Sequence, residues 1–273
     1  MNDLKKELLA ALGRKEAMLA MNYYNAETLK GVLLAAGSVG RPVILQLSRS
    51  TIEYLGLKVA TELGRAALAQ YGVKGWIHLD HGDTPELVQQ CLDAGFDSVM
   101  IDASEKPFRE NIEISARVVR MAEKYSAHVE AELGYVAKLG QSSDRVGFTD
   151  PGDAMTFAEY TGVDALAVAI GTVHGFYREE PMLDLERLAL IHSMVPIPLV
   201  LHGASGVPPV QLRKAIREGI CKINIATDIK DIFMRTVKES LSLTDEIDIR
   251  KVFPPAIDAV KELVVEKYKT IIL

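Results

Sequence analysis

Residues 97–132 read DSVMIDASEKPFRENIEISARVVRMAEKYSAHVEAE and contain the repeating unit that decides the fold. Two short apolar runs, 97–101 and 128–132, flank a segment from Phe108 to Tyr125 whose apolar residues recur at helical spacing. A strand, a helix and a second strand in this order are typical of two parallel strands joined by a crossover helix. The stretch therefore predicts one strand–helix–strand unit of a parallel sheet.

The same alternation runs along the whole chain. Six further apolar runs have the length of buried strands, namely 17–22, 42–47, 75–79, 165–169, 198–201 and 221–225. A segment with helical spacing of its apolar residues follows each of these runs. Continuous apolar strands that alternate with helices are typical of a parallel sheet covered on both faces. Eight units within 273 residues favour an α/β fold of the closed (β/α)8 TIM-barrel type over an open sheet. We expect a single barrel domain over 1–273, with an N-terminal helix at about 2–13 and a C-terminal helix at about 253–268.

Composition and charge exclude several classes of function. The net charge of −6 argues against broad binding to nucleic acid or to anionic membranes. The N-terminus lacks the apolar core of a signal peptide, and no apolar run reaches the ~20 residues that span a bilayer. Cys91 and Cys221 have no CxxC spacing, which is typical of a reducing compartment. We therefore expect a cytoplasmic protein with a small-molecule substrate and with no nucleic-acid or membrane partner.

Polar side chains able to do chemistry stand at the carboxyl ends of most of the expected strands. They are Asn22, Ser48, Asp80, His81, Asp102, Glu132, His174, His202 and Asn224. In a β/α barrel these ends converge on one mouth, where the active site is built. The clustering therefore predicts an enzyme whose site lies at this mouth.

Three histidines of this set, His81, His174 and His202, come from three different strand ends. Three neutral imidazoles leave a fourth zinc position open for water or substrate, which is the pattern of a catalytic rather than a structural zinc site. Each histidine taken singly is more often a hydrogen-bonded core or surface group. The remaining three, at 78, 128 and 192, are expected to be structural.

Two small-residue turns follow the last two expected strands. Residues 202–206 read HGASG, and residues 224–228 read NIATD and open a helix. Backbone N–H groups in such turns and at helix N-termini bind anions, and the loops after strands seven and eight are the usual phosphate position in this fold. The alternative is that the glycines only permit a tight turn and that Asp228 only caps the helix.

These runs together resemble a known enzyme family. The segments HLDH at 78–81, SVMIDAS at 98–104, VEAELG at 129–134, AVAIGTVHG at 167–175, LHGASG at 201–206 and KINIAT at 222–227 are similar to motifs of class II ketose-bisphosphate aldolases, in the family's order. The residues of these motifs are most similar to those of the tagatose-bisphosphate and fructose-bisphosphate aldolases. The resemblance implies a lyase that reversibly cleaves a phosphorylated ketose to dihydroxyacetone phosphate and an aldehyde.

The resemblance also implies roles for particular residues. It implies zinc on His81, His174 and His202, with Asp102 and Glu132 as secondary metal carboxylates, and Asp80 as the acid/base at the C4 oxygen. The triose and its phosphate are implied to contact Gly175, Gly203, Ala204, Ser205, Asn224, Ile225, Ala226 and Thr227, with Na⁺ or K⁺ nearby. Further substrate contacts are expected at Asn22 and Ser48, and at Arg250 for a distal phosphate, sometimes from a neighbouring subunit. A homodimer or homotetramer is implied.

The chain departs from the family pattern at two places. The stretch 133–150 lacks the glutamate that many relatives use to move the proton of the triose carbon; Asp144 or Tyr135 could replace it, or the loop could be a shortened surface loop. Arg49 stands where the family often has a small or neutral residue. We hypothesise that Arg49 contacts an anionic substrate group, with a solvent-facing side chain as the alternative. Both departures leave the natural ketose, its C4 stereochemistry and the aldehyde partner open.

Three other functions compete with this interpretation. An aldolase of the same mechanism could act on a different acidic or phosphorylated ketose. A Schiff-base aldolase could use Lys222, which shares strand parity with Asn224 and so points into the expected barrel. A non-catalytic barrel subunit would bind the same ligands without cleaving them.

Overall fold

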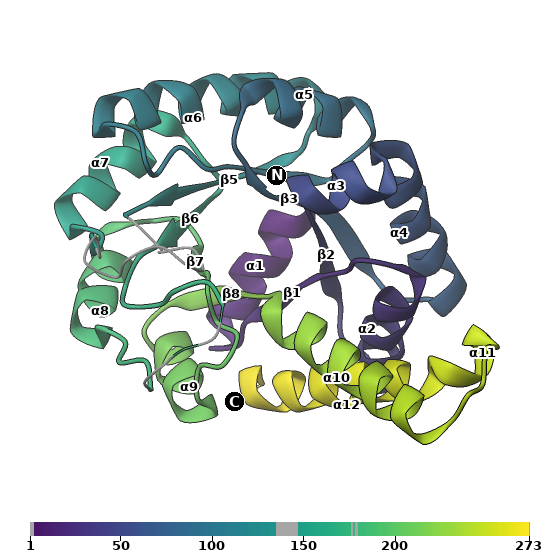
Figure 1. The fold of residues 1–273 in the computed structure, drawn as a ribbon. Coiled ribbons are helices and arrows are strands. Elements are labelled where there is room, and N and C mark those ends of the chain that lie inside the picture. Colours follow the sequence, from purple (N-terminus) through teal and green to yellow (C-terminus); the bar gives the residue numbers. More distant parts are fainter. Residues whose placement is uncertain (1–2, 135–146, 176, 178–179, 273) are drawn as a thin grey trace.

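The computed structural model describes residues 3–134, 147–175, 177 and 180–272, and its eight strands close into one barrel (Figure 1). Every pair of neighbouring strands is parallel, including the pair that joins the first strand to the last. The strands are β1 (Met18–Asn22), β2 (Val43–Ser48), β3 (Gly75–Gly82), β4 (Ser98–Ile101), β5 (His128–Leu133), β6 (Ala165–Val168), β7 (Leu199–Leu201) and β8 (Ile220–Ile225). The predicted (β/α)8 barrel is confirmed.

Helices surround the barrel and connect successive strands (Figure 1). They are α2 (Ala26–Val39), α3 (Arg49–Leu55), α4 (Leu57–Tyr71), α5 (Pro85–Asp93), α6 (Phe108–Ala122), a 3₁₀ turn η1 (Glu123–Tyr125), α7 (Pro151–Thr161), α8 (Leu185–Met194), α9 (Pro209–Arg217), α10 (Thr227–Leu243), α11 (Ile249–Val252) and α12 (Pro254–Ile271). Local signals set their ends. Asn25 and Thr28 form a capping box at the start of α2, and Gly40 ends that helix in a left-handed conformation.

Helix α1 (Asp3–Gly13) closes the amino-terminal end of the barrel and runs across its centre in Figure 1. Its buried residues Leu4 and Leu8 pack in one cluster with Met18, Ile44 and Trp76 from the first three strands. This end of the barrel is therefore filled with apolar side chains, and in this fold active sites lie at the opposite, carboxyl end of the strands.

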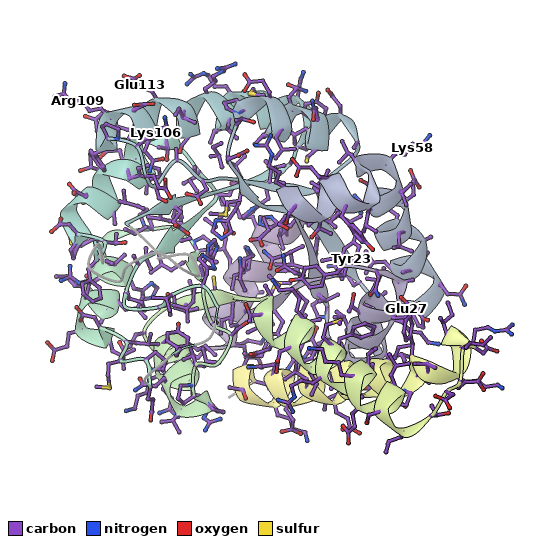
Figure 2. All side chains as sticks on the ribbon, in the orientation of Figure 1. Tyr23, Glu27, Lys58, Lys106, Arg109 and Glu113 are labelled. Carbon is purple, nitrogen blue, oxygen red and sulfur yellow. The ribbon has the colours of Figure 1, made fainter. Side chains whose placement is uncertain are left out.

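Apolar side chains fill the layer between the strands and the surrounding helices, whereas polar and charged side chains lie inside the barrel. Tyr23, which follows β1, is buried and donates a hydrogen bond to the Ala60 carbonyl of α4 at 2.7 Å. By contrast, Lys58 of α4 and Arg109 and Glu113 of α6 point away from the barrel (Figure 2). Inside the barrel the strands bury polar and charged groups: Gln46, His78, Ser98, His128, Glu130, Glu132 and Lys222. Buried charges need partners, so this interior is a candidate site rather than ordinary core.

The described part of the chain contains no helix that is long and apolar enough to cross a membrane.

Candidate active site

The end of β3 turns two consecutive side chains toward the barrel mouth. Side chains of a regular strand alternate between its two faces, so a neighbour of the inward-facing Asp80 should point outward. Instead, the register with β4 shifts between Leu79 and Gly82, and His81 has a φ of 51°. This bulge re-aims His81 so that its Nε2 lies 3.9 Å from Asp80 Oδ1. A positive φ is uncommon at a residue other than glycine, and at His81 it accompanies the bulge that re-aims the side chain.

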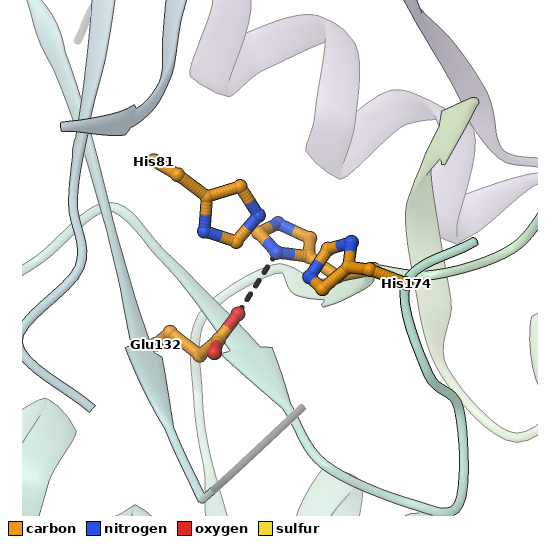
Figure 3. A group of neighbouring side chains, drawn as sticks. His81, Glu132 and His174 are labelled. Carbon is orange, nitrogen blue, oxygen red and sulfur yellow. Dashed lines mark ion pairs between the residues drawn. The ribbon is translucent and has the colours of Figure 1, made fainter. Parts of the chain in front are cut away.

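Four side chains from β3, β5 and the loops after β6 and β7 converge at the mouth: His81, Glu132, His174 and His202. Figure 3 shows His81, Glu132 and His174 pointing toward one another, with the ion pair of Glu132 to His202 as a dashed line. One possible ligand atom of each residue lies within 4.8 Å of the other three. Three imidazoles and one carboxylate form a donor set that divalent transition metals bind.

The hydrogen bonds of these four ligand atoms show whether a metal fits here. Nε2 of His81, Nε2 of His174, Nδ1 of His202 and Oε2 of Glu132 are buried and make no hydrogen bond. The last two lie 2.9 Å apart but without hydrogen-bond geometry. Buried polar atoms are almost always hydrogen-bonded, and a cluster of exceptions calls for a ligand. These residues fit a divalent metal.

The opposite nitrogens of two of these rings are hydrogen-bonded to carboxylates. Nδ1–H of His81 donates to Asp102 at 2.8 Å, and Ser104 binds the other oxygen of Asp102. Nε2–H of His202 donates to Glu130 at 2.8 Å. A carboxylate on one nitrogen fixes the tautomer and leaves the other nitrogen free as a ligand. Asp102 therefore lies behind His81, whereas Glu132 lies within the cluster.

The surroundings of the cluster shift the pKa values of two of its histidines in opposite directions. Burial disfavours a charged imidazole, yet the carboxylates of Glu130 and Glu132 outweigh burial and raise the pKa of His202 to about 10. Burial and the neighbouring rings of His81 and His202 lower the pKa of His174 to about 3. The carboxylates of Glu130 and Glu132 thus favour positive charge at this end of the cluster, which is the charge that a bound cation would supply.

Asp80 is the carboxylate that faces the pocket beside the cluster. Its Oδ2 accepts a hydrogen bond from Asn22 Nδ2 at 2.9 Å, and its Oδ1 accepts from Gln46 Nε2 at 3.3 Å and Asn224 Nδ2 at 3.4 Å. Burial alone would raise the pKa of Asp80, but the charges of His81 and His202 and the Asn22 hydrogen bond lower it. Asp80 is therefore ionised at neutral pH and able to accept a proton.

The turns after β7 and β8 form a second polar wall of the same pocket. Ser205 Oγ accepts from the backbone N–H groups of Ala226 at 3.4 Å and Asp228 at 3.3 Å, at the start of α10. Helix α10 has no side-chain cap from its own N-cap residue Ala226, and its start, Ala226 and Thr227, lines this pocket. The pocket is lined by Asn22, Asp80, His81, His174, Gly175, Gly203, Ser205, Asn224, Ala226 and Thr227. The structure thus brings together most of the site residues that the sequence singled out.

Several expected contact residues lie outside this pocket lining. Ala204 and Ile225 are buried in the hydrophobic core around the barrel. Ser48 caps α3. Arg49 is exposed and forms ion pairs with Glu53 at 3.0 Å and with Asp83. Arg250, on α11, is exposed and paired with Asp248. Asp144 and Tyr135, the expected replacements for the loop glutamate, lie outside the described residues.

Sequence reasoning missed three residues that support the site. Glu130 and Gln46 carry an inward parity signal, because each stands two positions before an expected mouth residue on its strand. Tyr177 carries no such signal. Its hydroxyl accepts from the Val173 N–H at 3.0 Å and donates to the Gly203 carbonyl at 2.7 Å, which joins the loops of His174 and His202.

Lys222, the candidate for a Schiff base, lies below the cluster. Its Nζ is 2.8 Å from Glu130 Oε2 and 3.4 Å from His78 Nε2, and its side chain is 1% exposed. This is the arrangement of a buried lysine that neutralises a carboxylate. A Schiff-base nucleophile needs instead an uncharged amine with access to substrate.

Comparisons with known proteins agree with this geometry. The sequence model of class II fructose-bisphosphate aldolases matches residues 2–272. The chain belongs to the class II fructose-bisphosphate aldolase family. A fructose-bisphosphate aldolase of Geobacillus stearothermophilus is 39% identical, over 98% of this chain and 95% of the relative. One from Giardia intestinalis is 37% identical, over 97% of this chain and 91% of the relative.

Solved structures of similar proteins extend this result. The YdjI aldolase from Escherichia coli K12 superposes with a TM-score of 0.89 at 34% identity, covering 98% of this chain and 96% of that one. A putative fructose-1,6-bisphosphate aldolase from Coccidioides immitis has a TM-score of 0.90 at 26% identity, covering 99% and 96%. The chain is therefore an aldolase of the lyase class, from a family that uses a divalent metal and acts on phosphorylated sugars. Family membership argues against both the Schiff-base and the non-catalytic alternatives.

Proposed function

We propose that this class II aldolase is zinc-dependent and reversibly cleaves a tagatose- or fructose-bisphosphate-like ketose to dihydroxyacetone phosphate and an aldehyde. The observation that carries the proposal is the convergence of four buried ligand atoms that make no hydrogen bond, beside an ionised aspartate and a turn of small residues. His81, His174 and His202 hold the metal, and Glu132 is the fourth donor or a secondary carboxylate. Asp102 orients His81 through its Nδ1.

Substrate binding orients the ketose between the two walls of the pocket. The phosphate of the triose half binds the N–H groups at the start of α10 and the turn 203–205, where Ser205 already gathers two such donors. Gly175 and residues 224–227 complete this wall, with a Na⁺ or K⁺ ion nearby. Because the phosphate is remote from the reacting carbons, its binding energy is used to position them.

Transfer of the C4 hydroxyl proton falls to Asp80, whereas the proton of the triose carbon is moved by another group. Zinc, when bound, polarises the ketose carbonyl and thereby stabilises the charge that the triose half acquires. Asp80 takes the proton of the C4 hydroxyl as the C3–C4 bond breaks, and returns it in the reverse reaction. Asn22, Gln46 and Asn224 hold its carboxylate in place through three amide hydrogen bonds.

An aldolase of the same mechanism on a different acidic or phosphorylated ketose is the second candidate function. The residue that favours it is Arg49, an exposed guanidinium at the start of α3 whose partners Glu53 and Asp83 are also exposed. An anionic substrate group would compete with Asp83 for Arg49. Arg250 could reach a distal phosphate only from a neighbouring copy in a homodimer or homotetramer. We place the enzyme in the cytoplasm, consistent with its two free, buried cysteines.

A panel of phosphorylated and acidic ketoses tests this function. Each ketose is assayed for release of dihydroxyacetone phosphate, with and without a chelator, and after zinc is added back. We expect release from a bisphosphorylated ketose that the chelator abolishes and zinc restores. Release that persists in chelator, together with borohydride trapping of substrate on the protein, would contradict the proposal.

A further inference from the structure

A chain of buried polar contacts connects the candidate metal cluster to the interior of the barrel. Glu130 lies at its centre and is fully buried. Its Oε1 accepts from His202 Nε2 at 2.8 Å, and its Oε2 accepts from Lys222 Nζ at 2.8 Å. Lys222 Nζ also lies 3.4 Å from His78 Nε2. Glu130 is thus fixed on both oxygens and contacts only groups inside the barrel.

The two nitrogens of His202 are divided between this chain and the cluster. Nε2 is bonded to Glu130, whereas Nδ1 is buried, makes no hydrogen bond and lies 2.9 Å from Oε2 of Glu132 in the cluster. A neutral imidazole carries its proton on one nitrogen only, and a ligand nitrogen must carry none. A carboxylate at Nε2 keeps the proton there and leaves the Nδ1 lone pair free.

We propose that Glu130 is a positioning residue for the metal centre. Its carboxylate fixes His202 in the tautomer and orientation that present Nδ1 to the metal. The inference rests on the metal site proposed above, but it assigns a role to a residue that is not itself a ligand. Glu130 and Glu132 alternate with the outward-facing Ala131 on β5, so one strand supplies both a carboxylate in the cluster and the carboxylate behind it.

Lys222 has a part in the same arrangement. Its ammonium group lies 2.8 Å from Glu130 Oε2, so the second carboxylate oxygen is held while the first accepts from His202. Lys222 is therefore a counter-ion that supports the acceptor, not a nucleophile.

Zinc affinity is the measurement that tests this role. Zinc-free wild type, Glu130→Gln and the double variant Glu130→Gln/Lys222→Met are titrated with zinc in competition with a chromophoric chelator. A glutamine accepts a weaker hydrogen bond and can also present its own N–H to His202, which favours the wrong tautomer. We expect both variants to lose about 10- to 100-fold in zinc affinity. The double variant removes both buried charges, so it stays folded where the single variant leaves Lys222 unpaired.

A matched control separates positioning from general destabilisation. Asp164→Asn changes a carboxylate that accepts from the N–H of Val129 at the start of the same strand, but contacts no metal-binding histidine. We expect its zinc affinity to stay close to wild type even where its melting temperature falls. In ¹⁵N-histidine-labelled, zinc-loaded protein, the Nε2–H signal of His202 should be protected from exchange in wild type and in Asp164→Asn, and should shift and exchange in both Glu130 variants.

The outcomes distinguish this inference from the function on which it rests. If both Glu130 variants bind zinc as tightly as wild type and keep the Nε2–H signal, the positioning role is wrong while the metal site stands. If His202→Ala itself binds zinc as tightly as wild type, the metal site is wrong and the inference falls with it.

Discussion

Asp80 is held by amide side chains from three strands, Asn22 of β1, Gln46 of β2 and Asn224 of β8. An amide N–H stabilises the carboxylate form without supplying a proton of its own. The arrangement therefore keeps Asp80 ionised and aimed into the pocket, ready to receive a proton from the substrate.

Replacement of Asp80 by asparagine tests this assignment. The variant keeps the shape of the side chain but cannot accept a proton, so we expect kcat to fall about 10²- to 10⁴-fold. Bound zinc, measured by metal analysis, should stay at one ion per chain, because Asp80 is not among the ligand atoms of the cluster. A fully zinc-loaded Asp80→Asn enzyme with near-normal kcat would exclude Asp80 as the acid/base.

Residue types at strand ends were enough to locate Asp80 and the three histidines, because parallel strands deliver their carboxyl ends to one mouth. Partners below the mouth were harder to predict. Glu130 shares strand parity with Glu132, but parity alone does not say which buried carboxylate meets a metal and which meets a lysine. That choice depends on partners distant in the sequence, since Lys222 lies on β8 and His202 follows β7.

The turn after β7 is closely packed against the loop that carries His174. Gly203 has a φ of +64°, and a β-carbon there would lie 2.5 Å from the Val173 carbonyl oxygen. The loop that carries His174 therefore lies directly against the loop that carries His202. The Tyr177 hydroxyl joins the two loops through hydrogen bonds. The distance between two candidate ligands thus depends on a glycine.

Gly203→Ala should therefore disrupt the metal site as well as the turn. We expect a drop in melting temperature and a loss of zinc affinity on the order of tenfold or more, because the two histidine loops must separate. Zinc titration and thermal unfolding of the zinc-free protein measure the two effects.

Gly40→Ala is the matched control for that substitution. Gly40 has a similar φ of +63° but no atom within 4 Å of an added β-carbon. It carries the same left-handed strain, about 1–2 kcal/mol, without the clash. If Gly203→Ala lost no more zinc affinity than Gly40→Ala, close approach of the loops would not control the site.

Most strands begin and end within one residue of the expected apolar runs, because continuous apolar runs of this length have few alternatives in a parallel sheet. The exception is β3, which continues past residue 79 to Gly82. There the bulge and the left-handed His81 place two neighbouring side chains on one face. A period-two pattern cannot predict such a bulge, since the bulge breaks the period.

At the scale of the whole molecule, the barrel buries several ionisable side chains in its interior, where most proteins bury apolar side chains. His78 and His128 are fully buried within it and hydrogen-bond to Ser98. Burial, with the charge of Lys222 acting in the same direction, lowers the pKa of His78 well below its usual value. Burial lowers the pKa of His128 to about 4, although Asp164 and Glu130 oppose it. Both histidines are neutral in the folded protein.

Stability should consequently depend on pH below neutrality. Between about pH 6.5 and 4, the unfolded chain binds protons at these histidines and the folded chain does not, so the free energy of unfolding falls as pH falls. Each histidine contributes about 1.4 kcal/mol per pH unit in this window. Urea unfolding at stepped pH should show a flatter slope for His128→Gln than for wild type. Equal slopes would mean that His128 titrates alike in both states.

The position of the metal itself tests the central claim most directly. Crystals of the active, zinc-loaded enzyme are measured above and below the zinc absorption edge. We predict one anomalous peak bonded to Nε2 of His81, Nε2 of His174 and Nδ1 of His202, at about 2.0–2.1 Å from each nitrogen. An active crystal whose zinc peak lies away from these three nitrogens, or that shows no peak, would contradict the account.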